Sequence, residues 1–576
     1  MTADEIPEGT PDTVVARAAR PPRVPVFDPT LGIDVPRSFR GTPPHRLVAL
    51  GDSLLQGFQS GAIYNTDVSV PAIVAHELGA DLRYPRFGGP GGLPLNVEVL
   101  LRRIEERHGS TLQPWELPTA LFTARGFMDE VEDYWERGPG ATPPLVGYLH
   151  NLSCFGWDLR DALQKTARVC AERIATPRDD LVRQLVENNG ERAALYVYPN
   201  TDDRRREMTL FDVAAELGAE HDGDTEAGIE TLVVFLGSNN ALQTVTELQV
   251  VWSGDDFRDL DAKQAYTIWR PEHFDSEFAA VVAKLRDIDA RHVVLCTVPH
   301  VTIAPIARGI GTKNGSPYFP YYTRPWVDAR RFDASRDEHI TGAQARMVDA
   351  AIDLFDETIT EAVADARRAG LDWYLLDTAG ILDRLAARRY VDDLDARPAW
   401  WQPYPLPPTL AALDPVPDTR FLSADGHGGR DSGGLFSLDG VHPTTVAYGI
   451  LAQEIIDVMV RAGVEFRSPN GTVRNGPVAV DFERLLRHDT LVRTPPQNID
   501  STLSILGWVD EVLECSGCSC VSVCEGSGQV DDVSVCRHGV LHLLPRQRAR
   551  TARASRRNGV VLELRHLQGV HILRIE

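Results

Sequence analysis

Four residues in this chain are of the types that acyl transfer requires. The reaction needs a nucleophile, a base that titrates near neutral pH, a group that orients the base, and donors for the developing oxyanion. Ser53 can serve as the nucleophile, and His442 and Asp439 as the base and its partner. Asp439 and His442 are three positions apart, so they can meet within one turn while the other ring nitrogen faces the serine. Asn239, together with backbone N–H groups, can bind the oxyanion.

Each of these features also has a simpler structural interpretation. Gly51-Asp52-Ser53 is common as a strand-to-helix turn in which the serine caps the helix. Asp439 and His442 are equally compatible with a helix-start cap followed by a surface histidine, and Asn239 with an ordinary turn residue. Taken singly, the motifs leave both interpretations open.

The elements that must position these residues alternate between strand and helix. Short apolar runs predict strands, and three- and four-residue spacings of apolar side chains predict helices between them. This alternation predicts a parallel sheet with helices on both faces, a three-layer α/β/α sandwich. The first three strands are followed by Ser53, by Gly156 with Asn151 nearby, and by Asn239, at the edge where open α/β sheets place their chemistry. The predicted strands are 46–50, 145–149, 231–236, 292–298 and 373–376, and the predicted helices include 70–78, 95–138, 159–167, 278–285, 347–366 and 443–462.

Composition limits the classes of function. The 576 residues carry a net charge of -23, which argues against binding to nucleic acid or to an anionic membrane surface. No run of about 18 apolar residues is present, so we expect no membrane span. Acidic residues near the N-terminus stand where a signal peptide needs basic ones, so we expect a cytoplasmic protein. These observations leave the oligomeric state open.

Composition also predicts three regions. Residues 1–44 are rich in proline and predict an irregular arm strapped over the surface. Residues 45–466 contain all four motifs and the five strands predicted for the sheet, and so form the expected catalytic domain, while residues 474–513 carry a further plausible helix and strands. Residues 467–576 form a C-terminal extension, expected to be partly disordered, that is rich first in cysteine (Cys515 to Cys536, then His538) and then in arginine. A single Cys-x-x-Cys unit favours a disordered basic tail or a shift of reading frame over a zinc site.

Four motifs together resemble the GDSL esterases and lipases, also called SGNH hydrolases. Four blocks in the order of that family are much more specific than any one block alone. The chain departs from the family at Asn240, where aspartate is usual and supports the loop, and in long insertions at about 80–144, 170–228, 300–370 and 380–436. The matching blocks are Gly51-Asp52-Ser53-Leu54 with Gly57, Asn151-Leu152-Ser153-Cys154-Phe155-Gly156, Gly237-Ser238-Asn239-Asn240, and Asp439-Gly440-Val441-His442.

The resemblance implies a flavodoxin-like SGNH hydrolase fold with a mostly five-stranded parallel sheet and large helical and loop insertions. It implies Ser53 as nucleophile, His442 as base and Asp439 as its partner, with an oxyanion hole made by the Ser53 N–H, the Gly156 N–H and the Asn239 side chain. We therefore expect an esterase or lipase that cleaves a small-molecule carboxylic ester through an acyl-enzyme, without cofactor or metal. Acyl transfer to another alcohol, and a non-catalytic binding role on the same fold, remain alternatives.

The substrate-binding residues are not identified by these motifs. The insertions are expected to shape the substrate pocket. Within them, the aromatic segment 318–326 is a candidate wall for an apolar acyl site or a surface that stacks on a sugar, although aromatic loops are more often simply packed.

Overall fold

The computed structural model describes residues 6–36, 39–177, 186–221, 225–468, 471–503, 562–567 and 570–575. The chain divides into two compact units, Met1–Cys518 and Ser519–Glu576. In the second unit, strands β14 (Leu562–Leu567) and β15 (Val570–Ile575) pair antiparallel. The cysteine cluster, His538 and most of the arginine-rich segment lie outside the described residues. Within the described part of the chain, none of the helices combines the length and the apolar character needed to cross a membrane.

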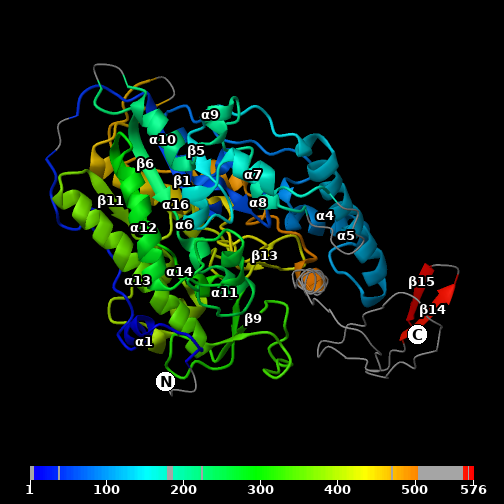
Figure 1. Ribbon diagram of the computed structural model, residues 1–576. Coiled ribbons are helices and arrows are strands. Elements are labelled where there is room, and N and C mark those ends of the chain that lie inside the picture. Colours follow the sequence, from blue (N-terminus) through cyan, green and yellow to red (C-terminus); the bar gives the residue numbers. More distant parts are fainter. Residues whose placement is uncertain are drawn as a thin grey trace, which may run out of the picture. The chain divides into compact units, whose positions relative to one another are not determined.

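A five-stranded, all-parallel sheet lies at the centre of the first unit (Figure 1). The structure thus confirms the predicted α/β class and the parallel sheet. Every residue of the central strand β6 is buried, which is typical of a strand covered on both faces. In spatial order the strands are β5 (Asn151–Ser153), β1 (His45–Gly51), β6 (Ile229–Phe235), β7 (Ala290–Cys296) and β11 (Trp373–Leu376).

The second strand begins later than predicted. Residues 145–149 form no strand, and β5 instead pairs Leu152 with Leu50 of β1. The backbone groups of Val146 are already hydrogen-bonded to Asn200, a residue distant in the sequence. The Val146 N–H donates to the Asn200 side chain at 2.8 Å, and the Val146 carbonyl accepts the Asn200 N–H at 3.1 Å. Leu145 is 82% exposed, whereas Val146 is buried and Tyr148 and Leu149 pack against a hydrophobic cluster, so the apolar run lies partly in the core without forming a strand.

Successive strand residues pack into two hydrophobic clusters, as the alternation of side chains along a strand requires. Val48 and Leu50 belong to one cluster, and Leu47 and Ala49 to the other. The first cluster includes residues of α6 (Leu159–Gln164), α10 (Leu210–Ala219), α12 (Pro271–Arg286) and α13 (Gly342–Arg368), and α12 and α13 pack side by side (Figure 1). The second includes α3 (Val70–Leu78), α16 (Thr445–Ala462) and α17 (Phe482–His488).

The predicted helices are present, but two of them are split, one begins later, and α12 and α13 are longer than predicted. The segment 95–138 is not one helix but two, α4 (Val97–His108) and α5 (Leu117–Glu132), separated around Gly109 and Pro114. The segment 159–167 is split at Lys165, which is extended, between α6 and α7 (Ala167–Arg173). The last helix begins at Thr445 rather than Pro443, because the residues before it form a tight turn. The other helices are α8 (Asn189–Ala194), α9 (Asp203–Arg206), α11 (Gln243–Thr246) and α15 (Pro408–Ala411), and the short strands are β4 (Leu93–Pro94), β8 (Arg308–Ile310), β9 (Tyr321–Thr323), β10 (Ile340–Thr341), β12 (Ser423–Ala424) and β13 (Arg430–Ser432).

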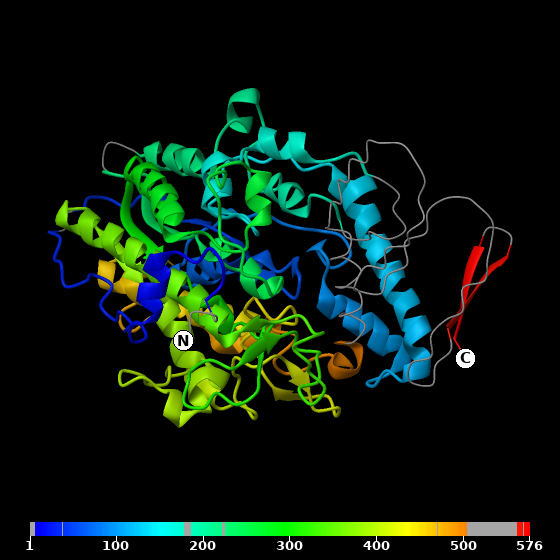
Figure 2. The same cartoon turned by 60° about the horizontal axis from the view of Figure 1, so that its bottom comes forward.

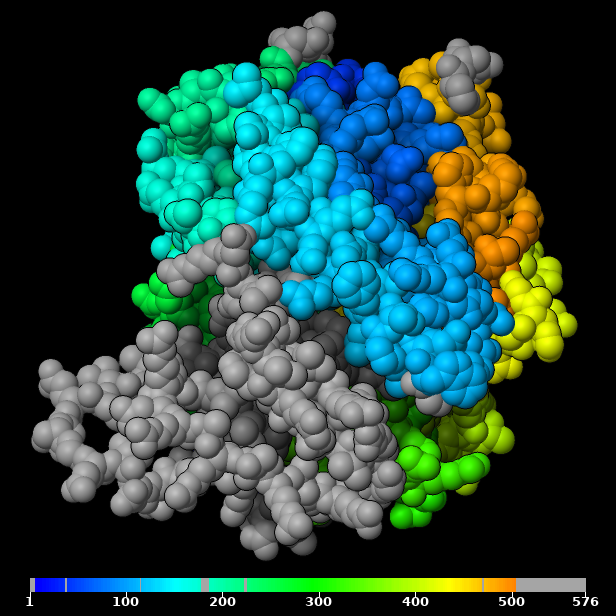
Figure 3. Space-filling model, turned by 90° about the vertical axis from the view of Figure 1, so that its right-hand side faces the viewer, coloured from blue at the N-terminus to red at the C-terminus, as the bar shows by residue number. Residues whose placement is uncertain are grey.

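The first insertion forms a helical hairpin of α4 and α5 along one side of the first unit (Figures 1 and 2). Arg102 of α4 donates to the carbonyls of Thr490 and Thr494, both at 2.9 Å. The Gln497 N–H donates to the Glu105 carboxylate at 3.1 Å. Figure 3 shows the hairpin (blue to cyan) beside these later residues (orange). The first compact unit therefore continues past residue 466.

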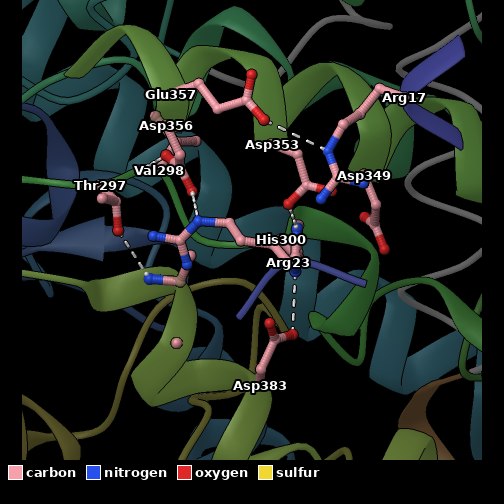
Figure 4. A network of polar contacts seen from close by, with 12 residues as sticks. Arg17, Arg23, Thr297, Val298, His300, Asp349, Asp353, Asp356, Glu357 and Asp383 are labelled. Carbon is pink, nitrogen blue, oxygen red and sulfur yellow. Dashed lines mark hydrogen bonds and ion pairs between the residues drawn. The ribbon is translucent and has the colours of Figure 1, made fainter. Parts of the chain in front are cut away.

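The N-terminal arm is tied to α13 and to the residue after β11 by two arginines whose side chains are only 8% and 10% exposed (Figure 4). Arg17, in α1 (Asp12–Ala18), pairs with Asp353 of α13 at 2.9 Å. Arg23 donates both ends of its guanidinium to Asp377, at 2.9 and 2.8 Å. His300 contacts Asp383 and Asp353 at 3.0 and 3.3 Å. Buried charges thus join the arm, α13 and the ends of two strands.

Candidate functional site

Ser53 lies at the carboxyl edge of the sheet, as the first residue of α2 (Ser53–Gln56) directly after β1. The cap of this helix is Asp52, whose carboxylate accepts the Leu54 N–H at 3.0 Å, so the Ser53 hydroxyl is not used as a cap. The turn is tight, because a Cβ on Gly51 would lie 2.9 Å from the Phe235 carbonyl oxygen. The Ser53 hydroxyl instead lies 2.8 Å from Nε2 of His442.

His442 and Asp439 come from a turn immediately before α16. Gly440 has φ +67° there, and a Cβ would lie 2.9 Å from the Ile306 nitrogen, so the turn requires glycine. One Asp439 oxygen accepts the N–H groups of Val441 and His442, at 2.9 and 2.8 Å. The other lies 3.0 Å from Nδ1 of His442. Because a carboxylate only accepts, Nδ1 carries the proton and Nε2 is left to accept from Ser53.

The Asp439 carboxylate has a further partner from a distant hairpin. The same oxygen that contacts His442 accepts the Gly61 N–H at 2.8 Å, in the turn between β2 (Phe58–Gln59) and β3 (Ala62–Ile63). Burial alone would raise the pKa of Asp439, but His442 and the N–H groups of His442 and Val441 outweigh it, and this pKa lies below its ordinary value. Asp439 is therefore a carboxylate at neutral pH. Sequence analysis missed Gly61, since a glycine between two short strands indicates only a turn.

Asp52 is a second buried carboxyl at this edge. Its side chain is fully inaccessible to solvent, and burial raises its pKa to about 6, although the Leu54 N–H and His442 act in the opposite direction. The cap of the Ser53 helix is therefore a group whose charge is costly to bury.

Gly156 and Asn239 follow the two strands that flank β1. Gly156 has φ +75° and open space where a Cβ would stand. Its neighbour Phe155 donates its N–H to Oε1 of Gln56 at 2.7 Å, which holds this loop against α2. The Asn239 NH₂ group donates to the Trp157 carbonyl at 2.9 Å and lies 3.5 Å from an Asp52 oxygen. Trp157 directly follows Gly156 in the sequence, and Asp52 directly precedes Ser53. The NH₂ group of Asn239 therefore lies at the same edge of the sheet as these two residues.

Asn240, where the resembling family usually has aspartate, contacts the loop after β5. Its side-chain oxygen accepts the Leu159 N–H, at the start of α6, at 3.4 Å. Its Nδ2 is buried and has no hydrogen-bond partner among the described residues. The asparagine therefore supports the Gly156 loop through its oxygen alone.

A buried group of charges anchors the end of the Gly156 loop. Lys263 Nζ lies 2.6 Å from Asp158 and 2.8 Å from Asp161. Lys165 Nζ lies 3.1 Å from Asp161 and 4.0 Å from the centre of the Trp157 ring. These residues also escaped sequence analysis, because Lys263 is 105 positions from Asp158.

An apolar cavity of about 140 Å³ opens beside Ser53 and His442, between α14 (Thr378–Leu385) and α16. The aromatic segment 318–326 is not part of its lining. The Tyr318 hydroxyl instead donates to Asp349 at 3.0 Å, and Tyr318, Phe319 and Tyr322 line other cavities. The apolar walls of the cavity at Ser53 include Leu54, Phe235, Leu242, Val301, Ile381, Leu382, Leu385, Leu435, Phe436, Ala447, Ile450 and Leu451.

The structure thus brings Ser53, His442 and Asp439 into direct contact and places Gly156 and Asn239 at the same edge of the sheet. Within the described part of the chain, no three His, Cys, Asp or Glu side chains are grouped in a way that could hold a metal ion. No protein-family model matches the chain, and a search of curated proteins returned no match.

Proposed function

We propose that this protein is a serine hydrolase of the GDSL (SGNH) type that cleaves carboxylic esters through an acyl-enzyme. The observation that carries the proposal is the linked set of contacts from Ser53 to His442 at 2.8 Å and from His442 to Asp439 at 3.0 Å. The order of the four motif blocks supports the family. The strand order, which becomes 2-1-3-4-5 when the five strands are numbered along the chain, supports a flavodoxin-like three-layer sandwich.

In the proposed reaction, the Ser53 oxygen attacks the ester carbonyl carbon while its proton passes to Nε2 of His442. Asp439 holds the Nδ1–H and stabilises the imidazolium. The Asn239 NH₂ group and the N–H groups of Ser53 and Gly156 donate to the carbonyl oxygen as it becomes negative. The bond to the alcohol then breaks, and His442 gives its proton to the leaving oxygen. Water repeats the sequence on the acyl-enzyme, releasing the acid and restoring Ser53.

Labelling with a fluorophosphonate, followed by peptide mass spectrometry, tests this proposal. We expect one modified residue, Ser53, and loss of both label and ester hydrolysis in Ser53→Ala. Ser253→Ala is the matched control. Ser253 also contacts a histidine nitrogen, in His273 at 2.8 Å, but its oxygen already accepts the Arg270 N–H at 2.9 Å. Folded wild-type protein that takes up no label would instead favour a non-catalytic binding role.

Analysis of the reaction products distinguishes acyl transfer to an alcohol from hydrolysis. If an added alcohol becomes acylated at the expense of free acid, the acceptor is an alcohol rather than water. The residues of the candidate site serve both reactions, so this assay, rather than a variant, distinguishes them.

A further inference from the structure

We propose that the cavity between α14 and α16 binds the aliphatic acyl chain of the ester, and that Ala447 limits the length of that chain. This inference rests on the proposed hydrolase function and adds the substrate class. The lining of the cavity includes Ser53 and His442, so a chain lying in it can continue into a carbonyl group held at the Ser53 oxygen.

Two helices present apolar side chains to the cavity at helical spacing. Ile381 and Leu385 lie one turn apart on α14, and Ala447 and Leu451 lie one turn apart on α16. All four side chains are only partly buried, although they pack against the hydrophobic cluster on that face of the sheet. Ala447 is the smallest of the four, so the space in front of it is available to a ligand.

Besides Ser53 and His442, four polar side chains line the cavity, and three of them already have protein partners. The fourth is Ser238, whose Oγ has no hydrogen-bond partner among the described residues. The Thr378 hydroxyl donates to the Thr297 carbonyl. The Thr419 hydroxyl accepts the Ala387 N–H at 2.8 Å and donates to the Leu385 carbonyl at 3.2 Å. The two ring nitrogens of His300 contact Asp383 and Asp353.

A sugar or a charged group placed in this cavity would therefore lose its water and gain at most a hydrogen bond with the Ser238 hydroxyl in return. An alkyl chain makes no hydrogen bonds to water, so it loses none on entering the cavity, and its transfer out of water is favourable. The chemistry of the lining favours an aliphatic chain over a polar substituent.

The acyl half of the ester fits the cavity better than the alcohol half. The acyl group becomes bonded to the Ser53 oxygen in the first step of the proposed reaction and stays there until water releases it in the second, whereas the alcohol departs in the first. A chain held between two helices keeps the acyl carbonyl at the serine while water attacks.

The test is the dependence of kcat/KM on chain length, with p-nitrophenyl acetate, butyrate, octanoate and dodecanoate. For the wild type we expect a rise of up to about fourfold per added methylene until the cavity is filled. Ala447→Phe should abolish the gain for octanoate over acetate. Val460→Phe adds the same ring to the same helix at a side chain that is 45% exposed, and should leave the profile unchanged.

Leu451→Ala is the second variant, and it tests the assignment of the cavity to the acyl chain if Ala447→Phe does not fold. It enlarges the cavity, so the preferred acyl chain should become longer. A second series, in which acetate esters carry alcohols of increasing length, should show no dependence on Ala447.

The outcomes separate the two proposals. A wild type that hydrolyses no ester of any length overturns the hydrolase function, and this inference with it. A wild type that is active, but whose profile is unchanged in both cavity variants, overturns the acyl cavity alone. A shift seen only in the alcohol series would show that the cavity holds the alcohol and would overturn its assignment to the acyl chain.

Discussion

Gln56 accepts the Phe155 N–H through its side-chain oxygen at 2.7 Å, although the two residues are 99 positions apart. Gln56 is the last residue of the helix that begins at Ser53, and Phe155 precedes Gly156. One partly buried hydrogen bond therefore joins the segment that carries the candidate nucleophile to the loop that carries a candidate oxyanion donor. The distance between those two groups depends on this contact.

Gln56→Met tests that dependence. Methionine matches the length of glutamine but cannot accept the Phe155 N–H, so the Gly156 loop should shift relative to Ser53. We expect kcat to fall by about 10- to 100-fold with little change in KM, since small misplacements of reacting groups have effects of this size. Steady-state kinetics with p-nitrophenyl butyrate measure the change. Gln249→Met, at an exposed glutamine, is the control, and an equal loss there would contradict the positioning role.

Asn239→Ala removes the proposed side-chain donor. The NH₂ group lies beside Trp157 and Asp52 at the edge that carries Ser53, and we expect kcat to fall by about 10²- to 10³-fold. The KM should change much less, because the charge on the oxygen develops only in the transition state. Asn189→Ala is the control, as its side chain donates to the Val186 carbonyl instead. If Asn239→Ala raised KM and left kcat unaltered, its assignment to the oxyanion hole would be wrong.

The local parts of the fold and site could be predicted from sequence, and the long-range parts could not. Apolar runs located four of the five strands, and the motif residues lie together because the carboxyl ends of parallel strands share one edge. The early start expected for the second strand was wrong because Asn200, 54 positions away, pairs with Val146. Gln56 and Gly61 were missed for the same reason, since neither residue type indicates a partner 99 or 378 positions distant.

Asp52→Asn should stabilise the fold at neutral pH. The folded pKa of Asp52, about 6, lies above its ordinary value of 3.8. The contribution of Asp52 to the free energy of unfolding is therefore fully present below its pKa in the unfolded chain, and it is lost as the pH rises through about 6. Asparagine still accepts the Leu54 N–H and has no charge to bury, so its advantage over the wild type should grow between pH 4 and 7, to about 2–3 kcal/mol. Urea unfolding across this range measures the difference, and a difference that stays flat would contradict the prediction.

Arg23→Met should destabilise the first unit strongly. The substitution leaves the buried Asp377 carboxylate without its cation. It also removes a cation that lies 3.9 Å from the buried carboxyl group of Asp356. Breaking a buried ion pair from one side typically costs about 3–5 kcal/mol. Arg168→Met breaks an exposed pair with Glu207 and should cost much less, because water screens charges at the surface. Denaturant unfolding of both variants makes the comparison, and similar losses would show that the arm is not held by its buried arginine.

The most direct test of the central claim is the chemical identity of the intermediate. Wild-type protein would be mixed with excess p-nitrophenyl butyrate, quenched in acid within the first turnovers, digested and analysed by mass spectrometry. The account predicts a butyryl group on the Ser53 hydroxyl that disappears once substrate is exhausted. Rapid ester cleavage with Ser53 unmodified throughout, or undiminished cleavage by Ser53→Ala, would contradict it.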